Sequence, residues 1–283
     1  MKKSICLIAL ICLLFAGCNK VEDESLKEDL SYLIQTYNRN DQNGTISKTI
    51  RTFNGYKETS LEYYVGGQLY QERKNYLYNG LKASWDIYTY QIDAINSENT
   101  RQHIECEYLD DTYLREKYRK TEYYYEDPQR DHITEYYSVY DGKKIVSQKY
   151  YSNSTLSYES YDYNYEGLRC THKWTHYNSG YPDDERNYII EYLDDTYLRQ
   201  KSSMYTRERY NSDGQLISSS TSYTVYDYDG KKVIGSQSYS NGKLLSMSRD
   251  YHYDGLTCYY YVDKHNNDGE VTSTTSYEVE YLE

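Results

Sequence analysis

The sequence has very few of the residues that interrupt strands or fill an ordinary hydrophobic core. Its 283 residues include only 2 prolines, 2 phenylalanines, 2 tryptophans and 3 methionines. Proline breaks the hydrogen-bond ladder of a sheet, so its scarcity leaves room for long strands. The mean hydropathy of −0.99 is typical of disordered chains, but disorder also requires few aromatic residues, and here 43 residues are tyrosine. Tyrosine favours strands, so we expect an ordered β protein.

Basic residues are also scarce, since 32 lysines and arginines stand against 44 acidic residues. A nucleic-acid-binding surface gathers lysine and arginine on one face, whereas here they are scattered, so nucleic acid is excluded as a partner. The sequence contains no Gly-x-Ser-x-Gly motif, phosphate-binding loop or dinucleotide fingerprint. We therefore expect a protein that is not an enzyme and binds no cofactor.

No metal site is expected either. There is no Cys-x-x-Cys motif, and His172 and His176, four residues apart, lie in a segment that indicates strand and loop rather than helix. The acidic pairs Asp110-Asp111 and Asp194-Asp195 recur beside Thr and Tyr and indicate turns. Neighbours in a turn do not face one scissile bond. An oxidising compartment would permit one disulfide among the three cysteines of the body of the chain, Cys106, Cys170 and Cys258.

The N-terminus predicts secretion. Lys2 and Lys3 precede an apolar run over residues 5–15, which is too short for a membrane-spanning helix of about 20 residues. This pattern is typical of a signal peptide over residues 1–17. Ala16-Gly17 followed by Cys18 resembles the bacterial lipobox, which implies that Cys18 carries a lipid and that the chain contacts the membrane through it. The alternative is an ordinary secretory signal with an incidental cysteine.

Residues 18–40 are expected to form a lipidated tether with a short helix. Within Ser25–Ile34, leucines and isoleucine recur at helical spacing. The acidic stretch after Asn19-Lys20 looks like the surface-export tags of Bacteroidetes lipoproteins, although an acidic linker is also simply well solvated. These resemblances imply an outer-membrane lipoprotein that faces either the periplasm or the cell surface.

Internal repetition dominates the rest of the chain. Glu107–Arg115 returns unchanged as Glu191–Arg199, 84 residues later, and Tyr140–Lys144 returns as Tyr228–Lys232, 88 residues later. We infer that residues 41–283 form one β-repeat domain of three copies, each of about 87 residues.

Each copy contains several turn signals, such as Asn241-Gly242 and Asp254-Gly255, which favour type I′ hairpin turns. Between the turns the pattern alternates: Tyr161, Tyr163 and Tyr165 are predicted to share one face of a strand. Strands of about nine residues, six per copy, predict an all-β meander of repeated antiparallel β-hairpins. The sequence leaves undetermined whether this extended sheet stays open or curls.

These repeats resemble two known groups. Tyr228-Asp229-Gly230 and Tyr253-Asp254-Gly255-Leu256 are similar to the YD-repeat (Rhs-like) family, in which Tyr-Asp precedes a glycine turn. The last segment also looks like the MORN-variant repeats of small bacterial lipoproteins. The first resemblance implies an extended, curling β-sheet, but this chain is too short for the toxin-enclosing role of that family.

The remaining functional hint is aromatic. Trp85, Trp174 and Tyr260 stand five, seven and five residues after equivalent glycines, so all three are predicted to lie on one face of the sheet. Such a row could stack on a glycan or on protein side chains. The alternative, which we favour, is that these rings belong to the buried face.

Three hypotheses follow. The first is a lipid-anchored cell-envelope protein with a non-enzymatic binding, adhesion or spacer role, its ligand a glycan or a protein. The second is a periplasmic or antitoxin-like binder of a protein partner. The third, which has the least support, is a hydrolase.

The lipobox yields a direct prediction. Replacing Cys18 with serine removes the thiol that accepts the lipid, so the variant should incorporate no labelled palmitate and should move from the detergent phase to the aqueous phase. Cys106→Ser, which leaves the lipobox intact, should behave as the wild type. Continued labelling of Cys18→Ser would contradict the assignment.

Overall fold

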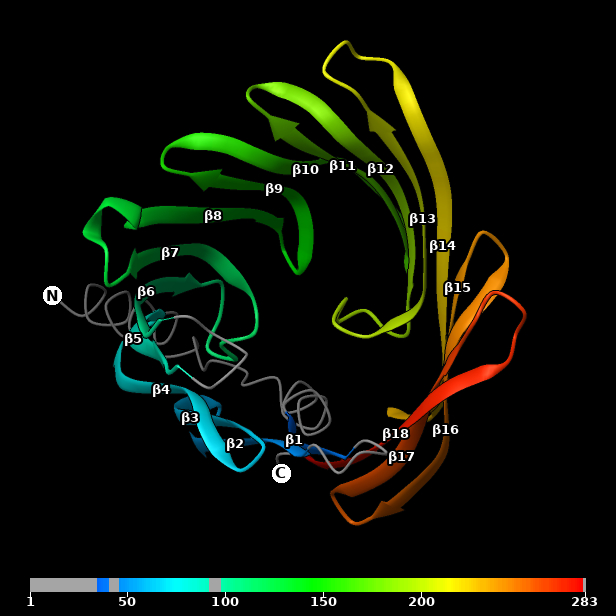
Figure 1. Cartoon of the computed structure of the whole chain (residues 1–283), viewed down its shortest axis with the longest axis horizontal. Helices are drawn as coiled ribbons and strands as arrows, with labels where there is room; N and C mark the ends of the chain where they lie inside the picture. Colours follow the sequence, from blue (N-terminus) through cyan, green and yellow to red (C-terminus); the bar gives the residue numbers. More distant parts are fainter. Residues whose placement is uncertain (1–34, 41–45, 92–97, 282–283) are drawn as a thin grey trace, which may run out of the picture.

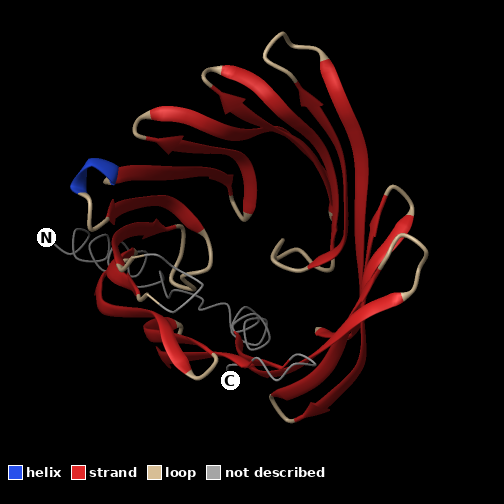
Figure 2. Ribbon diagram, viewed as in Figure 1, coloured by secondary structure: helices blue, strands red, loops and turns tan. Residues whose placement is uncertain are grey.

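The computed structural model describes residues 35–40, 46–91 and 98–281, and almost all of these lie in strands (Figure 2). The only helical element in these ranges is one 3₁₀ turn, Pro128–Arg130. The predicted all-β class and antiparallel hairpins are therefore confirmed. The signal peptide, Cys18 and the predicted helix over Ser25–Ile34 lie outside the described residues.

The described chain forms eighteen strands in a single sheet. In chain order they are β1 (Gln35–Asn40), β2 (Ile46–Asn54), β3 (Lys57–Val65), β4 (Gln68–Asn79), β5 (Lys82–Thr89), β6 (Thr100–Tyr108), β7 (Glu116–Tyr124), β8 (His132–Asp141), β9 (Lys144–Ser152), β10 (Thr155–Glu166), β11 (Arg169–Asn178), β12 (Tyr181–Tyr192), β13 (Gln200–Tyr210), β14 (Leu216–Asp229), β15 (Lys232–Ser240), β16 (Lys243–Asp254), β17 (Thr257–His265) and β18 (Val271–Tyr281).

Every strand pairs antiparallel with the next one along the chain, from β1–β2 to β17–β18. The first strand, β1, pairs with β18 as well, in register from Gln35↔Tyr281 to Asn40↔Ser276. The sheet therefore curls until its two ends meet at β1, around a wide interior (Figure 1). Residues 35–40, the end of the predicted tether, form this joining strand instead.

The tight turns fall into two geometries. At Asn241-Gly242 both central residues have positive φ (48° and 79°), which is the predicted type I′ pattern. At Asp254-Gly255 the prediction is wrong, because Asp254 is the last residue of β16 and only Gly255 (φ 61°) is left-handed. There the turn is Gly255-Leu256, and a positive φ at its first central residue is the type II′ pattern. Aspartate thus closes the strand, and glycine alone supplies the left-handed backbone.

A β-bulge recurs in the strand that precedes each of these Gly-Leu turns. In β10 the register shifts between Tyr161 and Asn164, with Asp162 at φ 55°. Corresponding shifts occur in β4 and β16, at Asn75 (φ 61°) and Asp250 (φ 57°). Because the bulge inserts one residue, Tyr161 lies on the opposite face from Tyr163 and Tyr165, which corrects the prediction that all three share a face. Bulges bend the strand and increase its twist, which helps a long sheet to curl.

Two loops identify the inner face. The segments between β6 and β7 and between β12 and β13 carry the repeated Leu-Asp-Asp-Thr-Tyr-Leu-Arg sequence and fold into the interior (Figure 1). They meet where the Arg115 guanidinium donates a hydrogen bond of 2.9 Å to the Thr196 carbonyl. Each loop is held in the same way: the Tyr113 hydroxyl donates to the Gly80 carbonyl and the Tyr197 hydroxyl to the Gly167 carbonyl, both at 3.1 Å.

The inner face carries the core. Tyr78 and Tyr108 pack against Tyr113 of the first loop, so this side of β4 and β6 faces inward. The largest buried cluster lies on the same side of β5 and β6 and consists of Ala83, Trp85, Ile87, Ile104, Cys106 and Tyr108. A second cluster on β17 and β18 consists of Cys258, Val279 and Tyr281.

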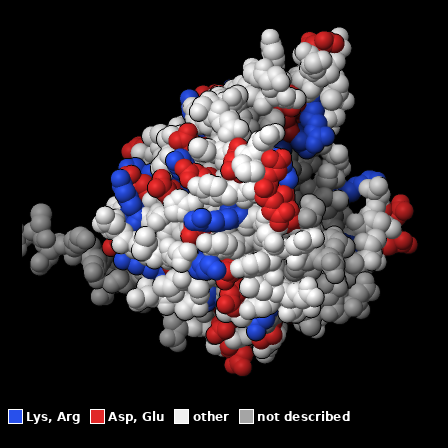
Figure 3. All heavy atoms as spheres, turned by 60° about the vertical axis from the view of Figure 1, so that its left-hand side comes forward, with Lys and Arg blue, Asp and Glu red and all other residues white. Residues whose placement is uncertain are grey.

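The outer face carries many charged side chains, together with exposed apolar ones such as Leu77 and Val139. Figure 3 shows basic and acidic side chains interspersed over the wall on the left-hand side of Figure 1. Across it, Lys120 pairs with Glu122 at 2.6 Å and Lys149 with Glu159 at 3.7 Å. Charged groups are costly to remove from water, so we expect these side chains of the outer face to remain in contact with water.

We expect the buried Arg115 of the first loop to contribute more to stability than an ion pair on the outer face. Arg115 is only 4% exposed, and it also pairs with Asp110 at 2.8 Å. Arg115→Ala removes the donor to the Thr196 carbonyl and one of the donors to Asp110, so the free energy of unfolding should fall by about 1–3 kcal/mol. Urea unfolding of the soluble chain Asn19–Glu283 measures this loss.

The matched control is Lys120→Ala, which breaks an ion pair on the outer face and should change the free energy of unfolding by less than about 0.5 kcal/mol. Equal effects of the two substitutions would mean that the loop contact does not stabilise the curled sheet.

Candidate functional site

Tyrosine rings on the inner face stack across neighbouring strands. Tyr150 of β9 and Tyr158 of β10 lie 4.7 Å apart, with a 7° angle between their planes. Across β16, β17 and β18, Tyr260 stacks between Tyr251 at 4.6 Å and Tyr277 at 5.0 Å. Aromatic pairs contribute about 0.5–1.5 kcal/mol beyond their buried area. These ladders are therefore part of what joins the strands, and they also make the interior aromatic.

The three residues of the predicted aromatic row all lie on this inner face, six strands apart, on β5, β11 and β17. They form no continuous row, because each belongs to its own stack. Trp85 stacks on Tyr76 at 5.5 Å, while the Trp174 ring lies 4.4 Å from the Arg186 guanidinium. Trp85 is 6% exposed, so this ring is buried, as in the alternative that we favour from the sequence.

A cavity of about 240 Å³, which we call the arginine pocket, lies beside Trp85. Strands β2, β3, β4 and β7 bring charged side chains to it that are distant in the sequence. Glu58 organises the pocket: it accepts a hydrogen bond of 2.7 Å from Arg51 Nε and another from the Tyr76 hydroxyl, and Arg73 approaches it at 3.5 Å. Its lining is Arg51, Phe53, Tyr56, Glu58, Arg73, Tyr76, Tyr78, Trp85, Tyr108, Tyr113, Leu114, Glu116 and Arg119.

A second inner cavity, the tyrosine pocket, adjoins the first. It has a volume of about 390 Å³ and shares Glu116 and Arg119 with the arginine pocket. The rest of its lining carries hydroxyl groups, from Thr121, Tyr123, Thr134, Tyr136, Tyr150 and Tyr158. The two cavities thus form one path along the inner wall from β2 to β10.

Two buried nitrogen atoms of the arginine pocket have no hydrogen-bond partner among the residues that the structure describes. They are Nε1 of Trp85 and Nε of Arg73. Both are N–H donors, and neither group can accept a hydrogen bond. Most buried polar groups in folded proteins are paired, so two unpaired donors in one cavity mark it as a place for a ligand or an ordered solvent molecule.

The tyrosines of the path remain hydrogen-bond donors at neutral pH. Burial raises the pKa of Tyr78 and of Tyr158 to about 12, because removal from water disfavours the charged phenolate. Their hydroxyl groups can therefore both donate and accept hydrogen bonds, which suits a polar, uncharged ligand surface.

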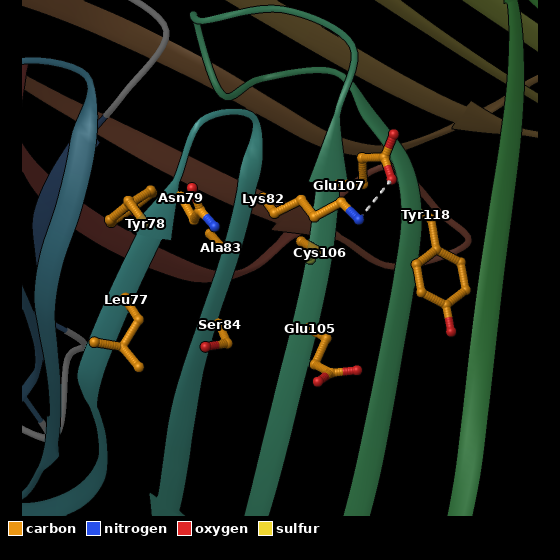
Figure 4. A pocket seen from close by; sticks show the side chains of 10 residues that line it. All are labelled: Leu77, Tyr78, Asn79, Lys82, Ala83, Ser84, Glu105, Cys106, Glu107 and Tyr118. Carbon is orange, nitrogen blue, oxygen red and sulfur yellow. Dashed lines mark ion pairs between the residues drawn. The ribbon is translucent and has the colours of Figure 1, made fainter.

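A shallow hollow of about 400 Å³ lies on the outer face (Figure 4). Leu77, Ser84, Glu105 and Tyr118 project into it from successive strands, and Leu77 is 70% exposed. At one end, Lys82 and Glu107 pair at 3.9 Å.

The aspartates of the two acidic pairs are hydrogen-bonded within their own loops. Asp110 accepts hydrogen bonds from the Thr112 amide and from Arg115, and Asp194 accepts the same pair from Thr196 and Arg199. Among the described residues no group of three His, Cys, Asp or Glu side chains is placed to hold a metal ion. The three cysteines considered for one disulfide, Cys106, Cys170 and Cys258, are free thiols.

The sequence indicates Trp85 but not the charged part of the pocket. Arg51, Glu58, Arg73 and Arg119 show no shared motif in the sequence, since they are isolated charges on four different strands. Only the register of β2, β3, β4 and β7 brings them together.

His172 predicts how stability depends on pH. Its ring lies between Tyr163 at 4.5 Å and Tyr188 at 4.7 Å, and burial lowers its pKa to about 4. The folded protein keeps His172 neutral where the unfolded chain, with a pKa near 6.5, binds a proton. This contribution is complete above about pH 6.5 and should fall by about 2–3 kcal/mol as the pH drops toward 4.

In urea unfolding between pH 4 and 7, the free energy of unfolding of His172→Phe should lack this fall toward low pH. His132→Phe, which replaces a ring stacked on Tyr123 at 4.1 Å, is the matched control and should keep the wild-type slope. Identical slopes for the two variants would refute the assignment.

Comparison with known proteins adds little to this description. No helix in the described part of the chain is long and apolar enough to cross a membrane. No family model and no curated protein matches, so the resemblances to the lipobox, YD-repeat and MORN-variant sequences stay predictions. Among solved structures, the chain is similar to a porin-like protein from Bacteroides vulgatus at 10% identity and a TM-score of 0.35, covering 85% of this chain and 96% of that one. A likeness this loose carries no conclusion about function.

Proposed function

We propose that this chain is a lipid-anchored protein of the bacterial cell envelope with a non-enzymatic binding role, and that its ligand occupies the inner face of the curled sheet. The observation that carries the proposal is the continuous path formed by the arginine and tyrosine pockets, which share Glu116 and Arg119. Ligand sites are typically concave, rich in aromatic side chains and provided with a few placed polar groups. The path has all three properties.

The location in this proposal rests on other observations. The signal sequence and Cys18 supply the anchor, and the ion-paired outer face suits a body that stands in water beside a membrane. Protease treatment of intact and of lysed cells distinguishes a cell-surface orientation from a periplasmic one.

A second candidate is the recognition of a protein partner on the outer face. The observation that favours it is the outer hollow of Figure 4, which Leu77 borders on one side and Tyr118 on the other, with Leu77 exposed. Aromatic side chains such as Tyr118 are enriched in protein interfaces. In this case the inner path would be structural, and substitutions inside it would leave binding unchanged.

Two adjacent tyrosines separate these candidates. Tyr136 lines the tyrosine pocket, whereas Tyr137 is 40% exposed on the outer face of the same strand. The soluble chain Asn19–Glu283 is immobilised and screened against a glycan array and against envelope proteins. For the ligand found, Tyr136→Ala should weaken binding about tenfold or more, a loss of about 1.4 kcal/mol, by removing a ring and a hydroxyl from the path.

Tyr137→Ala should bind as the wild type does, and circular dichroism should show both variants folded. A loss of binding with Tyr137→Ala alone would move the site to the outer face. Absence of binding to every glycan and envelope protein would refute the proposed function.

A further inference from the structure

We propose that the arginine pocket binds the carboxylate of an acidic saccharide, with a uronic-acid unit in the arginine pocket and the neutral part of the saccharide in the tyrosine pocket. This inference rests on the proposed function and gives its ligand a chemical class. Three observations support it: the unpaired donors in the arginine pocket, the net charge of its lining, and the hydroxyl groups that line the neighbouring tyrosine pocket.

Both atoms that lack a partner in the arginine pocket are hydrogen-bond donors. The two unpaired atoms, Trp85 Nε1 and Arg73 Nε, are both donors, so the missing partner is an acceptor. Glu58 does not supply it, because its contact with Arg73 is to the Nη1 atom, at 3.5 Å, and not to Nε. A ligand oxygen is the simplest group that completes the pocket.

The charge of the pocket favours an anionic oxygen. Its lining has three arginines (Arg51, Arg73 and Arg119) and two glutamates (Glu58 and Glu116), a balance of 3 − 2 = +1. The whole chain carries −12, so this is a local reversal of sign. The planar guanidinium of arginine donates two parallel hydrogen bonds to a carboxylate, which makes it the usual partner of that group.

The neighbouring pocket indicates what the carboxylate is attached to. Beyond the shared Glu116 and Arg119, the described residues that line the tyrosine pocket all bear hydroxyl groups; four are tyrosines and two are threonines. Hydroxyl groups donate and accept equally well, and aromatic rings present apolar faces. A chain of sugar units has the same mixture of hydroxyl groups and apolar ring faces. An acidic peptide would bring further carboxylates to a pocket whose described lining has one cation, Arg119, so we favour the saccharide.

The experiment is calorimetric titration of the soluble chain Asn19–Glu283. The probes are tetrasaccharides of galacturonic, glucuronic and mannuronic acid, each compared with its carboxyl-reduced neutral form, together with inorganic phosphate and tetraglutamate. We expect at least one uronic-acid tetrasaccharide to bind tenfold or more tightly than its neutral form.

Two substitutions test the residues directly. Arg73→Gln should abolish the preference for the acidic form, and Trp85→Phe, which keeps an aromatic ring but removes the N–H donor, should weaken binding of the acidic form about threefold to tenfold. The matched control is Trp174→Phe, at the equivalent place on β11, which should bind as the wild type does. Thermal unfolding shows whether each variant is folded, and Trp85→Phe keeps the test valid if Arg73→Gln is not.

The outcomes separate this inference from the proposed function. Equal binding of acidic and neutral saccharides, still weakened by Tyr136→Ala, would overturn the carboxylate assignment and leave the binding role standing. Arg73-dependent binding of tetraglutamate or phosphate without saccharide binding would overturn the saccharide class. Failure of all probes would overturn the inference, and only failure of the wider glycan and protein screen as well would overturn the binding role.

Discussion

Stacking of tyrosine rings between neighbouring strands is the interaction on which the rest of this structure depends. Aliphatic residues are few, and the two buried clusters lie on β5 and β6 and on β17 and β18. Between them the inner face relies on pairs such as Tyr150–Tyr158 and Tyr188–Tyr205, each aromatic contact adding to the cross-strand pairing of the backbone. A tyrosine can serve in this way because its ring packs while its hydroxyl remains hydrogen-bonded.

The same property gives the interior its chemistry. A wall of leucine and valine would have closed up into an apolar core, whereas a wall of tyrosine leaves hydroxyl groups along its cavities. Several hydroxyls bond to the backbone of the sheet, as Tyr78 does to the Glu58 carbonyl at 2.8 Å and Tyr165 to the Ile145 carbonyl at 3.0 Å. Others line the path between the arginine and tyrosine pockets. Structure and candidate site are thus built from one residue type.

Curvature comes from features that recur along the chain. The bulges at Asn75, Asp162 and Asp250 bend three strands in the same way, and the loops ending in Arg115 and Arg199 fold inward and touch. Loops of this kind usually cover the surface, because buried backbone groups need partners. Here the partners are present: Leu109 and Leu193 donate to the carbonyls of Arg115 and Arg199 within their own loops, at 2.7 and 2.9 Å.

The all-β class, the antiparallel hairpins and most turn positions are predictable from the sequence alone, because alternation and glycine placement are local consequences of strand geometry. The sequence also placed Trp85, Trp174 and Tyr260 on one face, since parity along a strand is local too. The sequence did not reveal the bulge that turns Tyr161 to the outer face, or the strand at Gln35–Asn40 that brings the sheet's ends together. The arginine pocket was decided by the tertiary structure alone, because Arg51, Glu58, Arg73 and Arg119 meet through the pairing of strands, and pairing register depends on the whole sheet.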